Sequence, residues 1–70
     1  MKYVGLTDEP DRRRAEQGDP PDWWHTKFRT EIEARNWETR MRAIPGYKGG
    51  PGGDGWQYGY MYTMGPGTRD

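Results

Sequence analysis

Residues 56–64, WQYGYMYTM, carry the clearest structural pattern of this 70-residue chain. Aromatic side chains occupy every second position from Trp56 to Tyr62, and glutamine, glycine, methionine and threonine fill the alternate positions. Because successive side chains of a β-strand point to opposite faces of its sheet, this alternation predicts a strand with one aromatic face. We therefore expect a folded domain with a largely aromatic core.

The composition is that of one small domain with a marginal core. Hydrophobic residues make up 30% of the chain and charged residues 31%, a balance that approaches that of disordered proteins. Four tryptophans, five tyrosines and one phenylalanine oppose this tendency, because each can bury a large apolar area. We expect a single domain over residues 1–64, followed by a flexible tail at residues 65–70.

The charge balance and the residue inventory exclude several classes of function. Eleven basic residues balance eleven acidic ones, so the chain lacks the strong positive charge that is usual in nucleic-acid-binding domains. There is one histidine and no cysteine or serine, which excludes Ser/His/Asp and Cys/His nucleophilic sites and zinc sites of several imidazoles or thiolates. No apolar run approaches the roughly 20 residues that cross a bilayer. We expect a cytoplasmic protein without membrane contact.

A strand and a helix are predicted in the N-terminal part of the chain. Residues 2–6, KYVGL, combine aromatic and β-branched side chains, which favours a strand. Thr7 or Asp8 can cap the helix that follows. Gly18 is a natural terminator, so we expect this helix to end near Gln17.

A second strand and a second helix are predicted between residues 24 and 44. Side chains alternate from residue 24 to residue 29, and the half-buried face consists of Trp24, Thr26 and Phe28. Thr30 and Glu33 form a capping box at the start of the helix. The apolar stripe of this helix consists of Ala34, Trp37, Met41 and Ile44.

The segment before the last strand is glycine-rich. Residues 46–55, GYKGGPGGDG, lack the Gly-Lys-Ser/Thr ending of a nucleotide-binding loop, so we expect a flexible connector. The elements then follow the order strand, helix, strand, helix, strand (β-α-β-α-β). This order predicts an α+β fold in which a small three-stranded antiparallel sheet packs with two helices.

Carboxylates, arginines and tyrosines remain as the groups that could carry chemistry. They suit the cleavage of phosphodiester bonds, because a hard cation such as Mg²⁺ binds through one or two carboxylates together with water and phosphate. The cation would activate water, an arginine would balance the phosphate charge, and a polar group would handle the proton.

Two segments of the chain resemble the GIY-YIG endonuclease family. The tyrosine of Tyr3-Val4-Gly5 lies ten residues before Arg13, as in the strand and helix of the second half of that family's signature. Phe28-Arg29-Thr30, followed by Glu33-Ala34 and Glu38, resembles a later segment, in which a strand ending in Phe enters a helix with a metal-binding glutamate. Together the two segments cover about half of the chain.

The resemblance implies a DNA endonuclease that depends on Mg²⁺ or Mn²⁺. Arg13 would contact the scissile phosphate, and Glu38 would hold one metal ion. Tyr3 would position or deprotonate the attacking water, and Tyr58 or Tyr60 would be the counterpart of the family's first-strand tyrosine. DNA is the expected partner, together with a targeting protein or further copies of the chain. We expect additional DNA contacts from Arg12, Gln17, Lys27, Arg29 and Lys48.

The sequence departs from the family in two places. The family's first strand is expected before Tyr3, and residues 56–63 are the available substitute. We therefore expect a circularly permuted arrangement, in which the last strand takes the central position beside residues 2–6. Many family members carry a histidine one helical turn after the arginine, where this chain has Gln17, which cannot act as a general base.

Simpler interpretations of the same residues remain open. Arg13 belongs to a run of three arginines that suits a solvated surface, and Glu38 has the spacing to pair with Arg42. Rows of tyrosines are common in cross-strand packing, Trp23 suits packing at a turn, and His25 suits an exposed strand position. The alternatives to an enzyme are a catalytically inactive scaffold that binds nucleic acid or another protein, and a small structural protein or engineered minidomain without a site.

Overall fold

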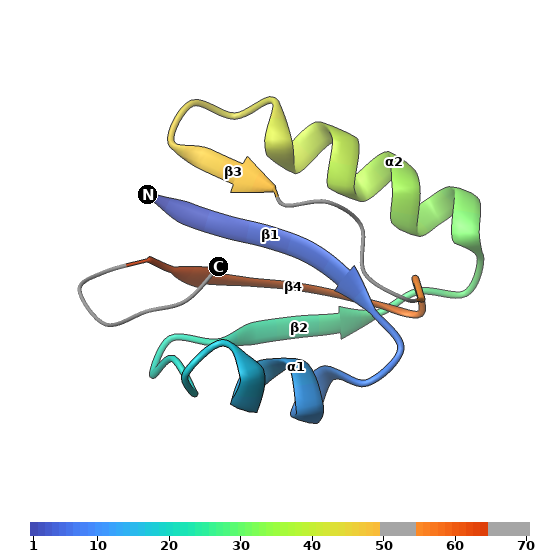
Figure 1. Cartoon of the computed structure of the whole chain (residues 1–70). Coiled ribbons are helices and arrows are strands. Elements are labelled where there is room, and N and C mark those ends of the chain that lie inside the picture. The colour runs from blue at the N-terminus through green and yellow to red at the C-terminus, as the bar shows by residue number, and fades with distance from the viewer. Residues whose placement is uncertain (50–54, 65–70) are drawn as a thin grey trace.

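Two helices and a four-stranded mixed sheet form an α+β fold in the computed structural model, which describes residues 1–49 and 55–64. Figure 1 shows these elements in chain order. They are β1 (Lys2–Thr7), α1 (Pro10–Glu16), β2 (Trp24–Lys27), α2 (Glu31–Arg42), β3 (Tyr47–Gly49) and β4 (Tyr58–Thr63). Neither helix of the described ranges has the length and hydropathy that a membrane span requires.

The strands lie side by side in the order β2-β4-β1-β3 (Figure 1). β4 runs antiparallel to both of its neighbours, whereas β3 runs parallel to β1, with Tyr47 opposite Lys2. The expected three-stranded antiparallel sheet is therefore wrong, because β3 adds a fourth, parallel strand at one edge. The expected α+β class and the two helices are correct.

β3 occupies the first part of the predicted glycine-rich connector, residues 46–55. Tyr47–Gly49 pair with the start of β1, and the backbone N–H of Lys2 donates a 2.8 Å hydrogen bond to the carbonyl of Gly46. The sequence does not indicate this strand, because it is short and surrounded by glycine, which has a low β propensity. Residues 50–54 of the connector and the predicted tail at residues 65–70 lie outside the described residues.

β4 lies between β1 and β2 in the sheet. It pairs with β1 along its whole length, from Thr63 opposite Lys2 to Tyr58 opposite Thr7. Its other edge pairs with all of β2. The last strand thus lies next to the first one, in the position expected for it from the sequence.

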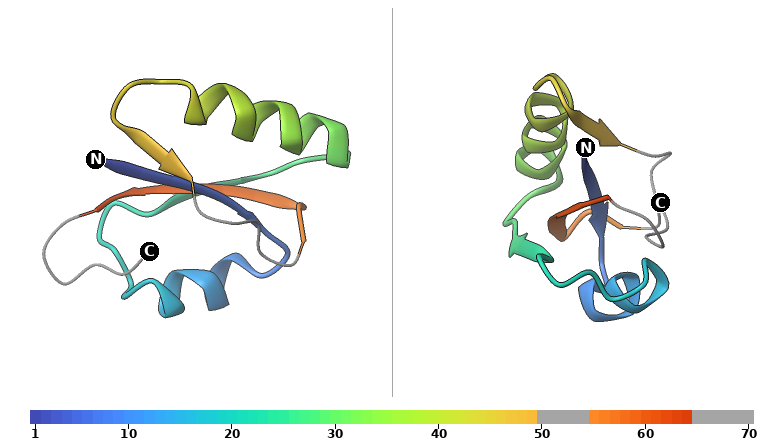
Figure 2. Two further views of the ribbon diagram at one scale, coloured as in Figure 1. Left: turned by 45° about the horizontal axis from the view of Figure 1, so that its top comes forward. Right: turned by 90° about the vertical axis from the view of Figure 1, so that its left-hand side faces the viewer.

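The two helices lie on opposite sides of the sheet (Figure 2). The buried aromatic core of the side toward α1 consists of Tyr3, Tyr60 and Tyr62. On the other side, Trp37 of α2 packs against Gly59, where a Cβ atom would lie 2.6 Å from the indole, and against the Phe28 ring at 5.4 Å between centroids. A largely aromatic core, as predicted, therefore extends to both faces of the sheet.

Neither Thr7 nor Asp8, the residues predicted to cap α1, is its N-cap in the structure. Glu9 is the N-cap residue and makes no side-chain capping bond, while Thr7 Oγ1 accepts a 3.1 Å hydrogen bond from the Glu9 backbone N–H. The Asp8 carboxylate does not cap the helix, and its Oδ1 accepts the backbone N–H groups of residues 56 and 57 at 3.0 and 3.1 Å. Gly18, with a φ of 88°, terminates the helix as predicted.

α2 begins at the predicted capping residue. Thr30 Oγ1 accepts a 3.2 Å hydrogen bond from the Glu33 backbone N–H, and the Glu33 carboxylate accepts the N–H of Arg29 at 3.3 Å. The helix has 12 residues and ends before Ile44, which is 42% exposed. The buried side of α2 therefore centres on Ala34, and the predicted apolar stripe is shorter than the sequence suggests.

Candidate active site

Aromatic rings are stacked on the sheet face toward α1. The ring of Tyr3 lies 5.5 Å from Tyr62 and 6.2 Å from Tyr60, and Trp23 lies 4.7 Å from Tyr60 with the two planes 11° apart. Tyr3 is 7% exposed and Tyr60 is 3% exposed, whereas Tyr58 is half-buried. The alternative expectation, that these tyrosines pack in the core, is correct for Tyr3 and Tyr60. Because the Tyr60 ring is buried, any chemistry at this residue would involve its hydroxyl group.

The Tyr60 side chain crosses β1 directly over Gly5. A Cβ atom on Gly5 would lie 2.5 Å from the Tyr60 hydroxyl oxygen and 2.6 Å from the ring carbon that carries it. Any side chain larger than hydrogen would therefore displace the hydroxyl group. The glycine of the Tyr-Val-Gly segment thus fixes where the Tyr60 hydroxyl lies.

Charges from both helices act on the Tyr60 hydroxyl group. Burial raises the pKa of Tyr60 above its ordinary value of 10.0, and the neighbouring Tyr3 raises this pKa further. The positive charge of Arg13 on α1 lowers the pKa of Tyr60, and the negative charge of Glu38 on α2 raises it. The phenol therefore stays protonated at neutral pH and is a hydrogen-bond donor. Of the residues that the sequence singles out, Tyr3 stacks on Tyr60, whereas Arg13 and Glu38 influence its pKa through their charges, from helices on opposite sides of the sheet (Figure 2).

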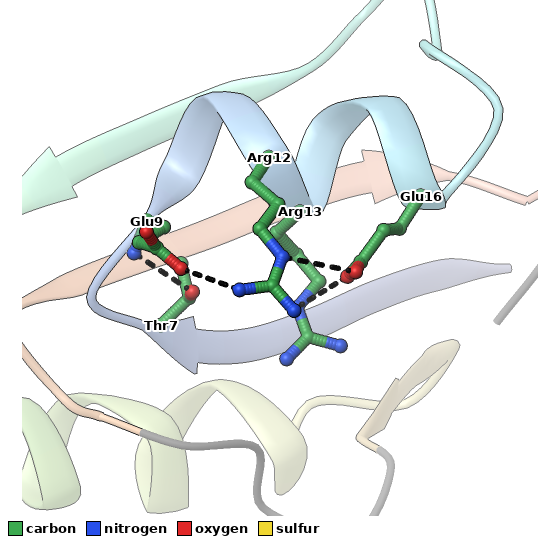
Figure 3. Close-up of a pocket in the computed structure, with 5 residues that line it drawn as sticks. All are labelled: Thr7, Glu9, Arg12, Arg13 and Glu16. Atoms are coloured by element: carbon green, nitrogen blue, oxygen red, sulfur yellow. Dashed lines mark hydrogen bonds and ion pairs between the residues drawn. The ribbon is translucent and has the colours of Figure 1, made fainter.

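A polar pocket of about 50 Å³, which we call the α1 pocket, lies beside α1 (Figure 3). Its lining residues are Thr7, Glu9, Arg12, Arg13 and Glu16. Arg12 lies between two carboxylates, at 2.8 Å from Glu9 and 3.3 Å from Glu16 (Figure 3). Arg13 contacts Glu16 at 3.7 Å, and its side chain is 27% exposed. Arg13 thus has weaker ion pairing than Arg12 and is better able to bind an anion.

Gln17 lies at the end of α1 and is directed into the core. Its Oε1 accepts a 2.7 Å hydrogen bond from the Tyr62 hydroxyl, and the residue is 6% exposed. The side chain therefore connects α1 to β4 and does not lie at the surface, where a DNA contact would need it. The other residues predicted to contact DNA are exposed: Arg12, Lys27, Arg29 and Lys48.

Glu38 is half-buried on α2. Within residues 1–49 and 55–64 it forms no ion pair, and the side chain of Arg42, the partner suggested by helical spacing, lies against Gly49. The same ranges contain no group of three or more His, Cys, Asp or Glu side chains that could hold a metal ion. A metal bound here would therefore have Glu38 as its carboxylate ligand, and Mg²⁺ can bind through one carboxylate with water and phosphate.

Trp23 belongs to this site, although packing at a turn is the main role that the sequence indicates for it. It stacks on Tyr60, and its indole N–H donates a 2.8 Å hydrogen bond to Nδ1 of His25. In the register of β2, His25 lies opposite Tyr60 and Lys27 lies opposite Tyr58. The same alternation that predicts β2 therefore places His25 and Lys27 on the tyrosine face, which is the sheet face that carries Tyr58, Tyr60 and Tyr62.

Comparisons of this chain with protein-family models, with curated protein sequences and with solved structures find no match. The basis for assigning a function is therefore the geometry of the residues around the Tyr60 hydroxyl.

Proposed function

We propose that this protein is a metal-dependent endonuclease that cleaves DNA phosphodiester bonds, with a site similar to that of GIY-YIG endonucleases. The observation that carries the proposal is the surroundings of Tyr60, whose ring stacks on Tyr3 and whose pKa is lowered by the charge of Arg13 on α1 and raised by the charge of Glu38 on α2. Tyr3, Arg13 and Glu38 come from β1, α1 and α2, which are far apart in the chain. They supply the phenol, guanidinium and carboxylate that the resemblance implies for such a site.

The position of β4 supports the same proposal. If β4 takes the place of the family's first strand, its tyrosines must lie beside the Tyr-Val-Gly strand. Tyr60 pairs with Gly5 and Tyr62 pairs with Tyr3, so the two tyrosine-bearing strands are neighbours. This is the arrangement that a circular permutation of the family's fold requires.

Arg13 is the residue that would bind the scissile phosphate. Its contact with Glu16 is long, at 3.7 Å, so the guanidinium can form charge-assisted hydrogen bonds with phosphate oxygens. Tyr60 is 3% exposed, so its protonated phenol would position the site, and the half-buried Tyr58 is the tyrosine that would donate a hydrogen bond to a phosphate oxygen or to the attacking water. Tyr3 stacks on Tyr60 and is itself buried, so we assign it a positioning role.

Glu38 is the residue that would hold Mg²⁺ or Mn²⁺. A bound ion would supply a Lewis acid for the phosphate and lower the pKa of a bound water. Glu38 forms no ion pair within the described ranges, which leaves its carboxylate able to take a cation. A half-buried carboxylate on the border of an apolar helix face is also unfavourable without such a partner.

The test is the nicking of supercoiled plasmid by purified protein in Mg²⁺, in Mn²⁺ and in EDTA. We expect nicking only with a metal, and a loss of about 100-fold or more in Arg13→Ala and in Glu38→Gln. Glu31→Gln and Arg40→Ala, which change exposed charges on α2, are matched controls that should nick like the wild type. Full activity of both site variants, with their folds verified by urea unfolding, would refute the proposal.

A non-catalytic module on the same scaffold is the second candidate, and the position of Gln17 favours it. The family's histidine is replaced by a residue whose side chain is committed to Tyr62. The net charge of zero also gives no general attraction to nucleic acid. A wild type that binds DNA or a protein but fails to nick plasmid with either metal would support this candidate.

A further inference from the structure

β2 extends the tyrosine face beyond the α1 pocket. Thr7, which lines that pocket, lies in one row with Tyr58 and Lys27 across three neighbouring strands. Adjacent strands are spaced by about 4.8 Å, so the backbones of Thr7 and Lys27 are about 10 Å apart. His25 lies in the next row, opposite Tyr60. A DNA strand whose phosphates run from the pocket along this row would therefore reach the side chains of Lys27 and His25 on β2.

The imidazole of His25 is fixed by two aromatic neighbours. The indole N–H of Trp23 donates to His25 Nδ1 at 2.8 Å, and the Tyr58 ring lies edge-on to the imidazole at 5.8 Å with the planes 80° apart. Because Nδ1 accepts this hydrogen bond, the proton of the neutral ring is on Nε2. His25 is exposed, so its Nε2–H is a neutral hydrogen-bond donor at the surface.

Lys27 is an exposed cation on the same face. Arg12 is matched by two carboxylates, and Arg14 is paired with Asp19 at 2.7 Å. In the part of the chain that the structure describes, Lys27 forms no such ion pair. Its ammonium group is therefore able to neutralise a phosphate without displacing a carboxylate.

We propose that His25 and Lys27 bind the DNA backbone next to the cleaved bond, His25 as a neutral donor through Nε2–H and Lys27 as a cation. The inference rests on the proposed function, since it takes DNA as the ligand, and it gives the direction in which the substrate strand crosses the sheet. Trp23 is the positioning residue of His25, because its hydrogen bond selects the tautomer that presents a donor.

The salt dependence of binding distinguishes the two roles. A fluorescein-labelled duplex is titrated with protein in EDTA at pH 8, and fluorescence anisotropy gives Kd at several NaCl concentrations. Loss of one cation reduces the slope of log Kd against log salt by about 0.9 for duplex DNA. We expect this reduction in Lys27→Ala, together with weaker binding.

His25→Ala should weaken binding about fivefold without changing that slope, since it removes a neutral hydrogen bond. Trp23→Phe, which keeps a ring against Tyr60 but removes the bond to His25, should weaken binding in the same salt-independent way. Arg40→Ala on α2 is the control and should bind like the wild type. Unchanged Kd in both β2 variants, or a changed slope in His25→Ala, would overturn the inference.

Plasmid nicking by the wild type, measured in parallel, separates this inference from the proposed function. Nicking by a wild type whose β2 variants bind normally would overturn the inference alone. Binding with the expected slopes and no nicking with any metal would support this surface and refute the endonuclease.

Discussion

The hydroxyl of Tyr62 donates a 2.7 Å hydrogen bond to Oε1 of Gln17, and both side chains are buried. This bond joins the end of α1 to the central strand β4, across 45 residues of sequence. α1 buries none of its own residues, so this contact is important for holding the helix against the sheet. Arg13 lies one turn earlier on the same helix.

Tyr62→Phe should lower the free energy of unfolding by about 1–3 kcal/mol, because the buried Gln17 oxygen loses its donor. Urea denaturation followed by tryptophan fluorescence measures this loss. The double variant Tyr62→Phe/Gln17→Leu removes both polar partners and should recover part of the stability. Tyr58→Phe, at a half-buried position, is the control, and a loss as large as that of Tyr62→Phe would contradict the prediction.

Gly5→Ala should displace the Tyr60 hydroxyl, because the new methyl group would lie 2.5 Å from its oxygen. We expect a loss of stability of about 1–3 kcal/mol from overpacking and, if the proposed function holds, a lower nicking rate. Gly49→Ala is a matched control on β3, since the atoms nearest to its methyl group would belong to the flexible Arg42 side chain. Equal thermal stability of Gly5→Ala and the wild type would show that Tyr60 does not depend on this glycine.

The elements that the sequence predicts are those whose side chains repeat with a clear period. Tyr58, Tyr60 and Tyr62 alternate along β4, and Trp24 and Phe28 lie on the α2 side of the sheet as their spacing indicates. β3 has no such repeat. Its three residues form a strand only because the start of β1 offers a parallel edge. Such a strand is a property of the tertiary structure and cannot be found in a local pattern.

The sequence names the candidate residues of the proposed site but not their contacts. The resemblance points to Tyr3, Arg13 and Glu38, and the charges of Arg13 and Glu38 influence Tyr60 only because both helices are docked on the sheet. The partner of Gln17 is equally non-local, since helical spacing places this residue near Arg13 and gives no indication of Tyr62. The sequence therefore predicts least well the contacts of polar side chains that have several available partners.

Asp8 should stabilise the start of the last strand through its Oδ1 atom, which accepts the backbone N–H groups of Trp56 and Gln57. Asp8→Ala removes both hydrogen bonds and should lower the free energy of unfolding by about 1–3 kcal/mol. Asp8→Asn keeps an oxygen at the same position and should retain most of the stability. Urea unfolding of the two variants is the measurement, and equal losses would show that the carboxylate charge matters more than the bonds.

Asp22 should make stability depend on acid pH. Hydrogen bonds with the side chain and the backbone of Thr63 hold the pKa of Asp22 below its ordinary value of 3.8. A carboxylate whose pKa is lower in the folded state stabilises the fold above the unfolded-state pKa, and the contribution is lost as pH falls through the folded-state value. The wild type should therefore lose more stability than Asp22→Asn between pH 7 and about pH 2.

The measurement for Asp22 is the urea midpoint of each protein at neutral and at acid pH, and the two curves should converge at the acid end. The effect should be modest, because Asp22 is exposed and solvent screens its interactions. Asp11→Asn, which removes another exposed carboxylate, from the first turn of α1, controls for the loss of a surface charge. If Asp22→Asn follows the wild type in parallel at all pH values, the hydrogen bonds to Thr63 do not favour the ionised carboxylate.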